Sequence, residues 1–185
     1  MADRGRVARV LFITHPQVRV DPSVPVPDWG PSAEARARMR AFDPPPVAAL
    51  WCSAERKAVE AAVILGRRLG LGPQILHELG ENDRSATGFL EPDVFKATAD
   101  RFFAEPQRSI EGWEPAAAAQ ARIVAALAAS PPGDVAIVAH GGVGTLLQCA
   151  LRGVPITRAL DQAGQGHWFA FERATRRVPH GWRSL

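Results

Sequence analysis

The chain of 185 residues is long enough for one domain with a sizeable core, so we treat residues 1–185 as a single domain. The formal net charge is +3, and no basic run is interleaved with aromatic residues, which argues against a nucleic-acid partner and leaves a small anionic ligand open. We find no signal peptide, no apolar run of transmembrane length and no pairing pattern for Cys52 and Cys149. We therefore expect a cytoplasmic protein that does not bind membranes.

The first predicted element is a strand that ends in a histidine. Residues 7–13 are apolar and rich in β-branched side chains, which is typical of a strand buried on both faces, and Thr14-His15-Pro16 follows. Residues 16–31 are rich in proline but carry few charges, so we expect a structured loop that forms one wall of a binding site. Arg19 and Asp21 on this loop could reach a ligand or could simply be solvated.

Helices and strands alternate in the first half. The pattern predicts a helix over 32–42, a strand over 47–51 and a helix over 54–69 that is capped by Ser53. Lys57 falls in the first turn of the last helix, near the carboxyl edge of the sheet. A cation there opposes the helix dipole, so Lys57 either serves the site or extends its charge to solvent.

The alternation continues in the second half. We expect a short strand over 74–77, a polar stretch over 78–88, helices over 92–103 and 115–129, and a last strand over 166–172 that is antiparallel at an edge. Strands that alternate with helices in this way predict a three-layer α/β/α sandwich with a mostly parallel central sheet.

A second buried strand ends in a histidine. Residues 135–139 follow a Pro-Pro-Gly-Asp turn and stop at His140, after which Gly141 and Gly142 lead into a helix over 143–151. A helix N-terminus there offers free N–H groups to an anion. Either histidine alone could be structural, but two strand-end histidines, His15 and His140, can meet at the carboxyl edge of one open sheet, where such sheets bind ligands.

These segments together resemble the histidine phosphatase superfamily, which has the phosphoglycerate mutase-like fold. Its members carry an Arg-His-Gly motif after the first strand, a Ser-Ser…Arg-Ala…Thr-Ala segment, a Leu-x-Glu motif and a strand-His-Gly-Gly motif. Residues 140–143 are the closest match, and residues 52–62 are similar to the second segment. Leu79-Gly80-Glu81 falls where the family's glutamate falls, whereas Glu78 comes three residues too early.

The resemblance implies a phosphatase that forms a phosphohistidine. His15 would attack phosphorus in its neutral form, and Glu81 would protonate the leaving oxygen and then activate water. His140 and the backbone at Gly141 and Gly142 would stabilise the phosphoryl charge. The resemblance implies no cofactor and no metal, and a small phosphomonoester or a phosphohistidine as substrate; mutase activity needs longer insertions than this chain has.

Two positions depart from the family pattern. Thr14 and Pro16 flank His15 where the family has arginine and glycine, and Lys57 replaces the helix arginine, which loses the bidentate fork that suits phosphate. We count Thr14 and Lys57 among the phosphate-binding residues and expect the missing charge to come from Arg19 or Arg84.

Other functions remain as alternatives. The two departures allow a catalytically weak relative that binds an anionic ligand or a protein partner. A homodimer through an edge strand or the region of Trp168 is left open. Dinucleotide binding has no support, because Leu147 stands where the third glycine of that fingerprint would be. The chain also lacks GxSxG, Walker A and HExxH motifs.

Overall fold

The centre of the molecule is one mixed sheet of six strands. The computed structural model describes residues 7–185, so residues 1–6, on which the absence of a signal peptide partly rests, lie outside it. The strand order is β3-β2-β4-β1-β5-β6. β4 (Val135–Ala139) pairs in parallel with both β1 (Arg9–Thr14) and β2 (Ala49–Ser53), and β2 pairs in parallel with β3 (Gln74–Leu76). β5 (His167–Glu172) runs antiparallel to β1, which confirms the mostly parallel α/β fold.

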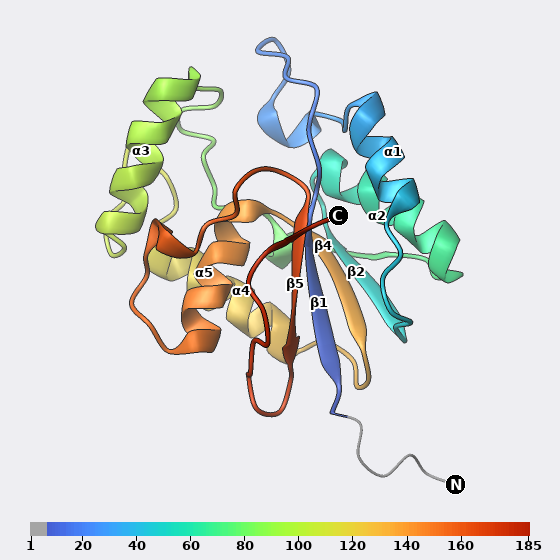
Figure 1. The fold of residues 1–185 in the computed structure, drawn as a ribbon. Helices are drawn as coiled ribbons and strands as arrows, with labels where there is room; N and C mark the ends of the chain where they lie inside the picture. Colours follow the sequence, from blue (N-terminus) through green and yellow to red (C-terminus); the bar gives the residue numbers. More distant parts are fainter. Residues whose placement is uncertain (1–6) are drawn as a thin grey trace, which may run out of the picture.

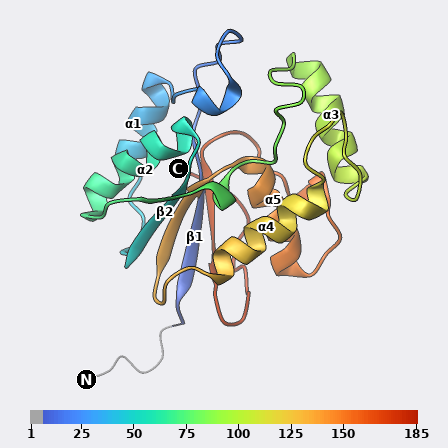
Figure 2. The ribbon, with the colours of Figure 1, turned by 180° about the vertical axis from the view of Figure 1, so that it is seen from behind.

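Helices cover both faces of this sheet. α1 (Ala33–Ala41) and α2 (Arg56–Leu69) lie on one face, and α4 (Ala116–Ala128) and α5 (Gly141–Arg152) lie on the other (Figures 1 and 2). α3 (Pro92–Ala104) stands at the carboxyl edge, away from the sheet (Figure 1). Within residues 7–185, none of the helices combines the length and the apolar composition that a membrane span requires.

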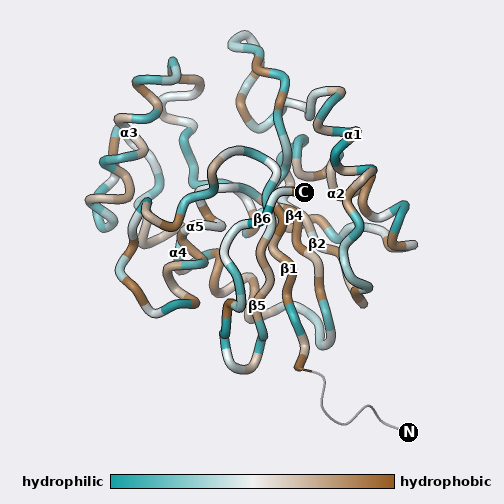
Figure 3. The backbone as a smooth tube through the Cα atoms, viewed as in Figure 1, coloured by the Kyte–Doolittle hydropathy of each residue, from teal (hydrophilic) through white to brown (hydrophobic). Residues whose placement is uncertain are grey.

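Alternation along the strands divides the core between these two faces. On β1, Leu11 and Ile13 pack toward α1 and α2, whereas Val10 and Phe12 pack toward α4 and α5. All five residues of β4 are buried, as expected for a strand that is covered on both sides. Figure 3 shows the resulting hydrophobic colouring of the central strands.

Several element boundaries differ from the prediction. β2 extends to Ser53, two residues beyond the predicted end, and α2 begins at Arg56 with Glu55 as its N-cap residue. Ser53 therefore does not cap the helix; its hydroxyl accepts the Glu55 N–H at 3.2 Å. β5 is antiparallel as expected, but the two-residue β6 (Arg183–Ser184) pairs with its outer side and takes the edge. Among residues 7–185, three short 3-10 helices lie in the connections: η1 (Val26–Asp28), η2 (His77–Leu79) and η3 (Arg158–Leu160).

Gly144 lies where α5 packs closely on β1, and an alanine there should destabilise the fold. A Cβ at this position would lie 2.7 Å from both Phe12 Cε1 and Trp182 Cη2. We expect Gly144→Ala to lower the free energy of unfolding by about 1–3 kcal/mol in urea titrations. Gly72→Ala is the control, since a Cβ there meets nothing within 4 Å. Equal stability of the two variants would contradict this packing.

Candidate active site

The parallel pairing of β1 with β4 brings the two strand-end histidines together. Thr14 pairs with Ala139 in the ladder, so His15 and His140 leave neighbouring strands at the same edge. The His15 N–H donates to the Ala139 carbonyl at 3.0 Å and extends the ladder by one bond. The two imidazole rings meet edge to face with their centroids 5.2 Å apart. Ser53, at the end of β2, lies on the other side of His140.

The surroundings of His15 define its tautomer and its charge. Nδ1 lies 2.9 Å from the Pro16 carbonyl oxygen, which can only accept, so Nδ1 carries the proton and Nε2 carries the lone pair. Burial, reinforced by the charges of His140 and Lys57, lowers the pKa of His15 to about 3. The ring is therefore neutral near pH 7, with Nε2 available as a nucleophile.

His140 lies behind His15 and is completely buried. Its Nε2 is 2.7 Å from Ser53 Oγ and 3.3 Å from Glu55 Oε1. Because a carboxylate only accepts, this geometry favours a proton on Nε2. Nδ1 has no hydrogen-bond partner among the described residues, and burial lowers the pKa of His140. The buried Nδ1 thus has no hydrogen-bond partner in the described chain, on a ring that packs edge to face against His15.

Lys57 is buried and paired. Its side chain is 4 % exposed, and Nζ lies 2.5 Å from Glu55 Oε2 and 2.8 Å from the Val26 carbonyl oxygen on the proline-rich loop. Burial alone would raise the pKa of Glu55, but the charges of His140 and Lys57 and hydrogen bonds from the Lys57 side chain and the Glu81 N–H lower it to about 2. Lys57 therefore points into the site, as one of the two sequence interpretations expected, but its charge is largely balanced by Glu55.

Glu81 occupies the anion-binding end of α5. Its two carboxylate oxygens accept the N–H groups of Gly142 and Val143 at 3.0 and 2.9 Å, and Oε1 also accepts the N–H of Asn82 at 3.2 Å. This corrects the expectation that the Gly142 N–H is free for phosphate, because the helix terminus already holds a carboxylate. Gly141 does line the cavity, as expected.

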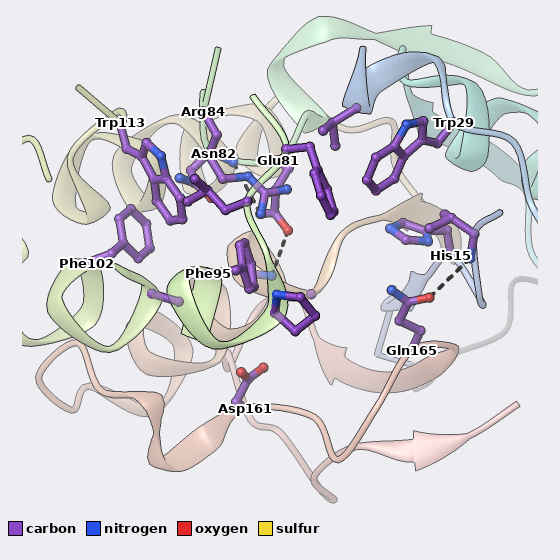
Figure 4. A pocket seen from close by; sticks show the side chains of 18 of the residues that line it. His15, Trp29, Glu81, Asn82, Arg84, Phe95, Phe102, Trp113, Asp161 and Gln165 are labelled. Atoms are coloured by element: carbon purple, nitrogen blue, oxygen red, sulfur yellow. Dashed lines mark hydrogen bonds between the residues drawn. The ribbon is translucent and has the colours of Figure 1, made fainter. Parts of the chain in front are cut away.

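These groups open onto a cavity of about 480 Å³, a size typical of small-molecule sites. His15, Lys57, Glu81 and Gly141 line it, whereas the fully buried His140 does not. Figure 4 shows His15 and Trp29 at one end, Glu81 near the middle, and Phe95, Phe102 and Trp113 at the other end. Trp29 on the proline-rich loop meets Phe89 on the loop before α3, with ring centroids 5.9 Å apart.

The remaining predicted phosphate ligands separate into one that reaches the cavity and two that do not. Arg84 lines the cavity, lies over the rings of Phe95 and Trp113, and makes no ion pair with any residue in 7–185. Arg19 is exposed and is not part of the lining. Thr14 is not part of the lining, and its buried hydroxyl is already engaged because it donates at 2.8 Å to Oε1 of Gln162, which does line the cavity. Direct contact of Arg19 or Thr14 with a ligand is therefore not part of this arrangement.

Sequence reasoning missed Glu55, Asn82 and Trp29. Glu55 stands two residues before Lys57 at a helix start, and this acid–base spacing was the available signal for a paired lysine. Asn82 lines the cavity while only 6% exposed, and its Nδ2 has no hydrogen-bond partner in the described part of the chain. Trp29 is positioned by tertiary contacts, including the hydrogen bond of its Nε1 to the Asp21 carbonyl at 2.9 Å.

The lowered pKa of His15 predicts a loss of stability toward acid. The unfolded ring takes up a proton below pH 6.5 and the folded ring only near pH 3, so stability is complete above pH 6.5 and falls as the pH drops through this window. At pH 5 the loss due to His15 is on the order of 2 kcal/mol. His15→Asn, which keeps a donor for the Pro16 carbonyl, should make the decline of Tm between pH 7.5 and 5 less steep, with the remaining decline due to His140, whose pKa burial also lowers. Protonation of Glu55, whose pKa is lowered to about 2, reduces stability only below about pH 4.5. An unchanged slope would contradict the assignment.

The pair of Glu55 and Lys57 should behave as a unit. Lys57→Met leaves a largely buried carboxylate without its cation and should cost about 3 kcal/mol in urea titrations. Adding Glu55→Gln should restore at least half of that loss. Lys96→Met is the matched control, because Lys96 forms an exposed pair with Asp100 and should change stability by less than about 0.5 kcal/mol. Additive effects of the Glu55 and Lys57 substitutions would contradict a coupled pair.

Comparisons with known proteins identify the family and the fold of the chain. The model of the histidine phosphatase superfamily (branch 1) matches residues 31–173, a range that begins after His15. No curated protein matches the chain. A mycobacterial glucosyl-3-phosphoglycerate phosphatase complexed with VO3 superposes with a TM-score of 0.77 at 25% identity, covering 96% of this chain and 100% of that one.

Two further solved structures share the fold. A protein described as mycobacterial hydrolase 1 has a TM-score of 0.76 at 23% identity over 97% of this chain and 100% of its own. The protein TTHB049 from Thermus thermophilus has a TM-score of 0.67 at 22% identity over 95% of this chain and 99% of its own. The family match spans most of the chain, and the chain belongs to the histidine phosphatase superfamily.

Proposed function

We propose that this protein is a metal-independent phosphatase that hydrolyses a small phosphomonoester through a phosphohistidine on His15. The observation that carries the proposal is the neutral His15 ring, whose Nδ1 is held by the Pro16 carbonyl and whose Nε2 is left as a nucleophile beside the cavity. Membership of the superfamily and the similarity to a glucosyl-3-phosphoglycerate phosphatase support a phosphatase in general. A phosphohistidine substrate is compatible with the same chemistry.

In the first step, Nε2 of His15 forms a bond to phosphorus and the ester P–O bond breaks. The protonated carboxyl group of Glu81 gives its proton to the leaving oxygen and becomes a carboxylate. The N–H groups of Gly142 and Val143 then hold that carboxylate where the structure shows it. Glu81 suits this role because it lines the cavity beyond His15 (Figure 4).

In the second step, water attacks the phosphohistidine. Glu81 takes a proton from the water as its oxygen bonds to phosphorus, and the P–N bond breaks to return His15 to its neutral form. The products are phosphate and an alcohol, and the Glu81 carboxyl group is again protonated. No step calls for a redox partner.

The phosphoryl charge is stabilised by groups other than the two arginines of the family motif, which are Thr14 and Lys57 in this chain. Arg84 is the cavity-lining cation that has no ion pair in the described chain, and we assign it the main electrostatic role. His140 can donate from Nδ1 once the phosphoryl group sits on His15, since an anion beside this unpartnered atom favours the protonated ring. Lys57 contributes less because Glu55 balances it.

Hydrolysis of p-nitrophenyl phosphate tests the proposal. We expect turnover that persists in EDTA, is lost by at least about 1,000-fold in His15→Ala, and drops about 10²–10⁴-fold in Glu81→Gln with slow leaving groups. Arg84→Gln should raise KM more than it lowers kcat. Acid-quench trapping with ³²P-labelled substrate should label wild type but not His15→Ala.

The control is Arg19→Gln, because Arg19 lies outside the cavity lining and its loss should leave kcat/KM within about twofold. A folded wild type without turnover or label would reject the phosphatase. The neutralised Lys57 and the engaged Thr14 would then favour a weak relative that only binds an anionic ligand.

A further inference from the structure

The cavity continues past Glu81 into a region with an aromatic and aliphatic lining. We name it the aromatic chamber and define it by Phe89, Leu90, Phe95, Phe102, Phe103 and Trp113. These residues come from the loop before α3, from α3 itself and from the segment before α4. None of them belongs to the motifs that identify the superfamily in this sequence, so the chamber is a feature that the catalytic residues do not explain.

The chamber walls are packed against one another. The Trp113 ring lies 5.8 Å from Phe95 and 6.0 Å from Phe102, measured between centroids. The one polar hydrogen of the indole is already used, because Nε1 donates to Thr87 Oγ1 at 2.8 Å. The surface that these rings present is therefore apolar, with no free donor from Trp113.

The polar residues elsewhere in the lining are mostly engaged. Arg158 pairs with Asp100, and its Nε lies 3.6 Å from Asp161. Asp161 also accepts the Thr145 hydroxyl at 3.0 Å. Asn82 differs from these, since it is nearly fully buried and its Nδ2 has no partner among the described residues. Arg84 also differs, because its guanidinium lies over the rings of Phe95 and Trp113 and has no ion pair in the described chain. The chamber is thus apolar except for this guanidinium and for the Asn82 amide beside Glu81.

The order of these groups indicates how a substrate lies. His15 stands at one end of the cavity, Glu81 near the middle and the chamber at the other end (Figure 4). If His15 attacks phosphorus and Glu81 protonates the leaving oxygen, the group attached to that oxygen extends into the chamber. Asn82 lies in the lining next to Glu81 and carries a donor, Nδ2, that has no partner in the described chain.

We propose that the natural substrate is a phosphomonoester of an aromatic alcohol, whose ring fills the chamber; this inference rests on the proposed function. A ring there replaces water against Phe89 and Phe95, which are partly exposed whereas Phe102 and Trp113 are nearly buried, and it can meet the Arg84 guanidinium that lies over Phe95. A sugar or glycerate body would bury hydroxyl groups that find few partners in the chamber. The leaving group is thus expected to differ from that of the glucosyl-3-phosphoglycerate phosphatase, although the fold is shared.

The test compares esters of primary alcohols, so that leaving-group acidity does not decide the result. We expect kcat/KM for 2-naphthylmethyl phosphate to exceed that for glycerol 3-phosphate at least tenfold. This ratio should fall at least fivefold in Phe89→Ala and in Phe95→Ala. Val94→Ala is the matched control, since Val94 is an exposed neighbour on α3 outside this cavity and should leave the ratio unchanged. A wild-type ratio of one or below, with glycerol 3-phosphate turned over, overturns the proposal.

A binding measurement separates this proposal from the phosphatase itself. Calorimetry with the phosphate-free alcohol 2-naphthylmethanol should show binding to wild type and to His15→Ala alike, weakened at least fivefold in Phe89→Ala and Phe95→Ala. If no ester is hydrolysed but the alcohol binds in this pattern, the aromatic chamber is supported as a binding site and the phosphatase proposal is rejected. If esters are hydrolysed but no binding is seen at about 1 mM, the chamber is not the aromatic site. Thermal unfolding of each variant checks that it is folded.

Discussion

The parallel register between β1 and β4 is the constraint on which the site depends. A strand of side-chain period two allows no slip, because a shift by one residue would turn Leu11 and Ile13 from one core to the other. β1 is held on both sides, by β4 in parallel and by β5 in antiparallel pairing. Because Thr14 is fixed opposite Ala139, the positions of the next residues, His15 and His140, are fixed relative to each other. His15 and His140 meet because the two hydrophobic cores require this register.

Charge around the histidines is balanced in pairs rather than accumulated. Glu55 faces Lys57, and Glu81 faces the positive end of α5. Burial keeps the pKa values of both histidines low, so neither ring adds a positive charge at rest. The site therefore offers a dianion less fixed positive charge than an arginine-lined pocket would, and a ligand must gain more of its binding energy from contacts with its uncharged part. The cavity's large share of aromatic lining is consistent with that division.

The sequence predicted what depends on short-range patterns. The strand runs, the helix periodicity and the two strand-end histidines are local signals, and the structure has the strands and helices within a few residues of the expected places. What the sequence did not reveal depends on which way side chains turn after folding. Arg19 and Thr14 are close to His15 in the chain, yet one extends outward and the other is bound to Gln162. The contacts of Glu55, the placement of Asn82 and the contact of Trp29 with Phe89 depend on segments that are far apart in the sequence. Such long-range contacts leave no periodic pattern in the sequence.

The buried pair of Glu55 and Lys57 also limits how this site could change over generations. An arginine placed at position 57 would meet the Glu55 carboxylate, which matches the guanidinium fork as well as a phosphate does. The new side chain would be held by the protein instead of by a ligand. Removal of Glu55 first would leave Lys57 buried without its anion. A change at one of the two positions therefore alters the surroundings of the other, and an arginine at position 57 is free for a ligand only when Glu55 is replaced as well.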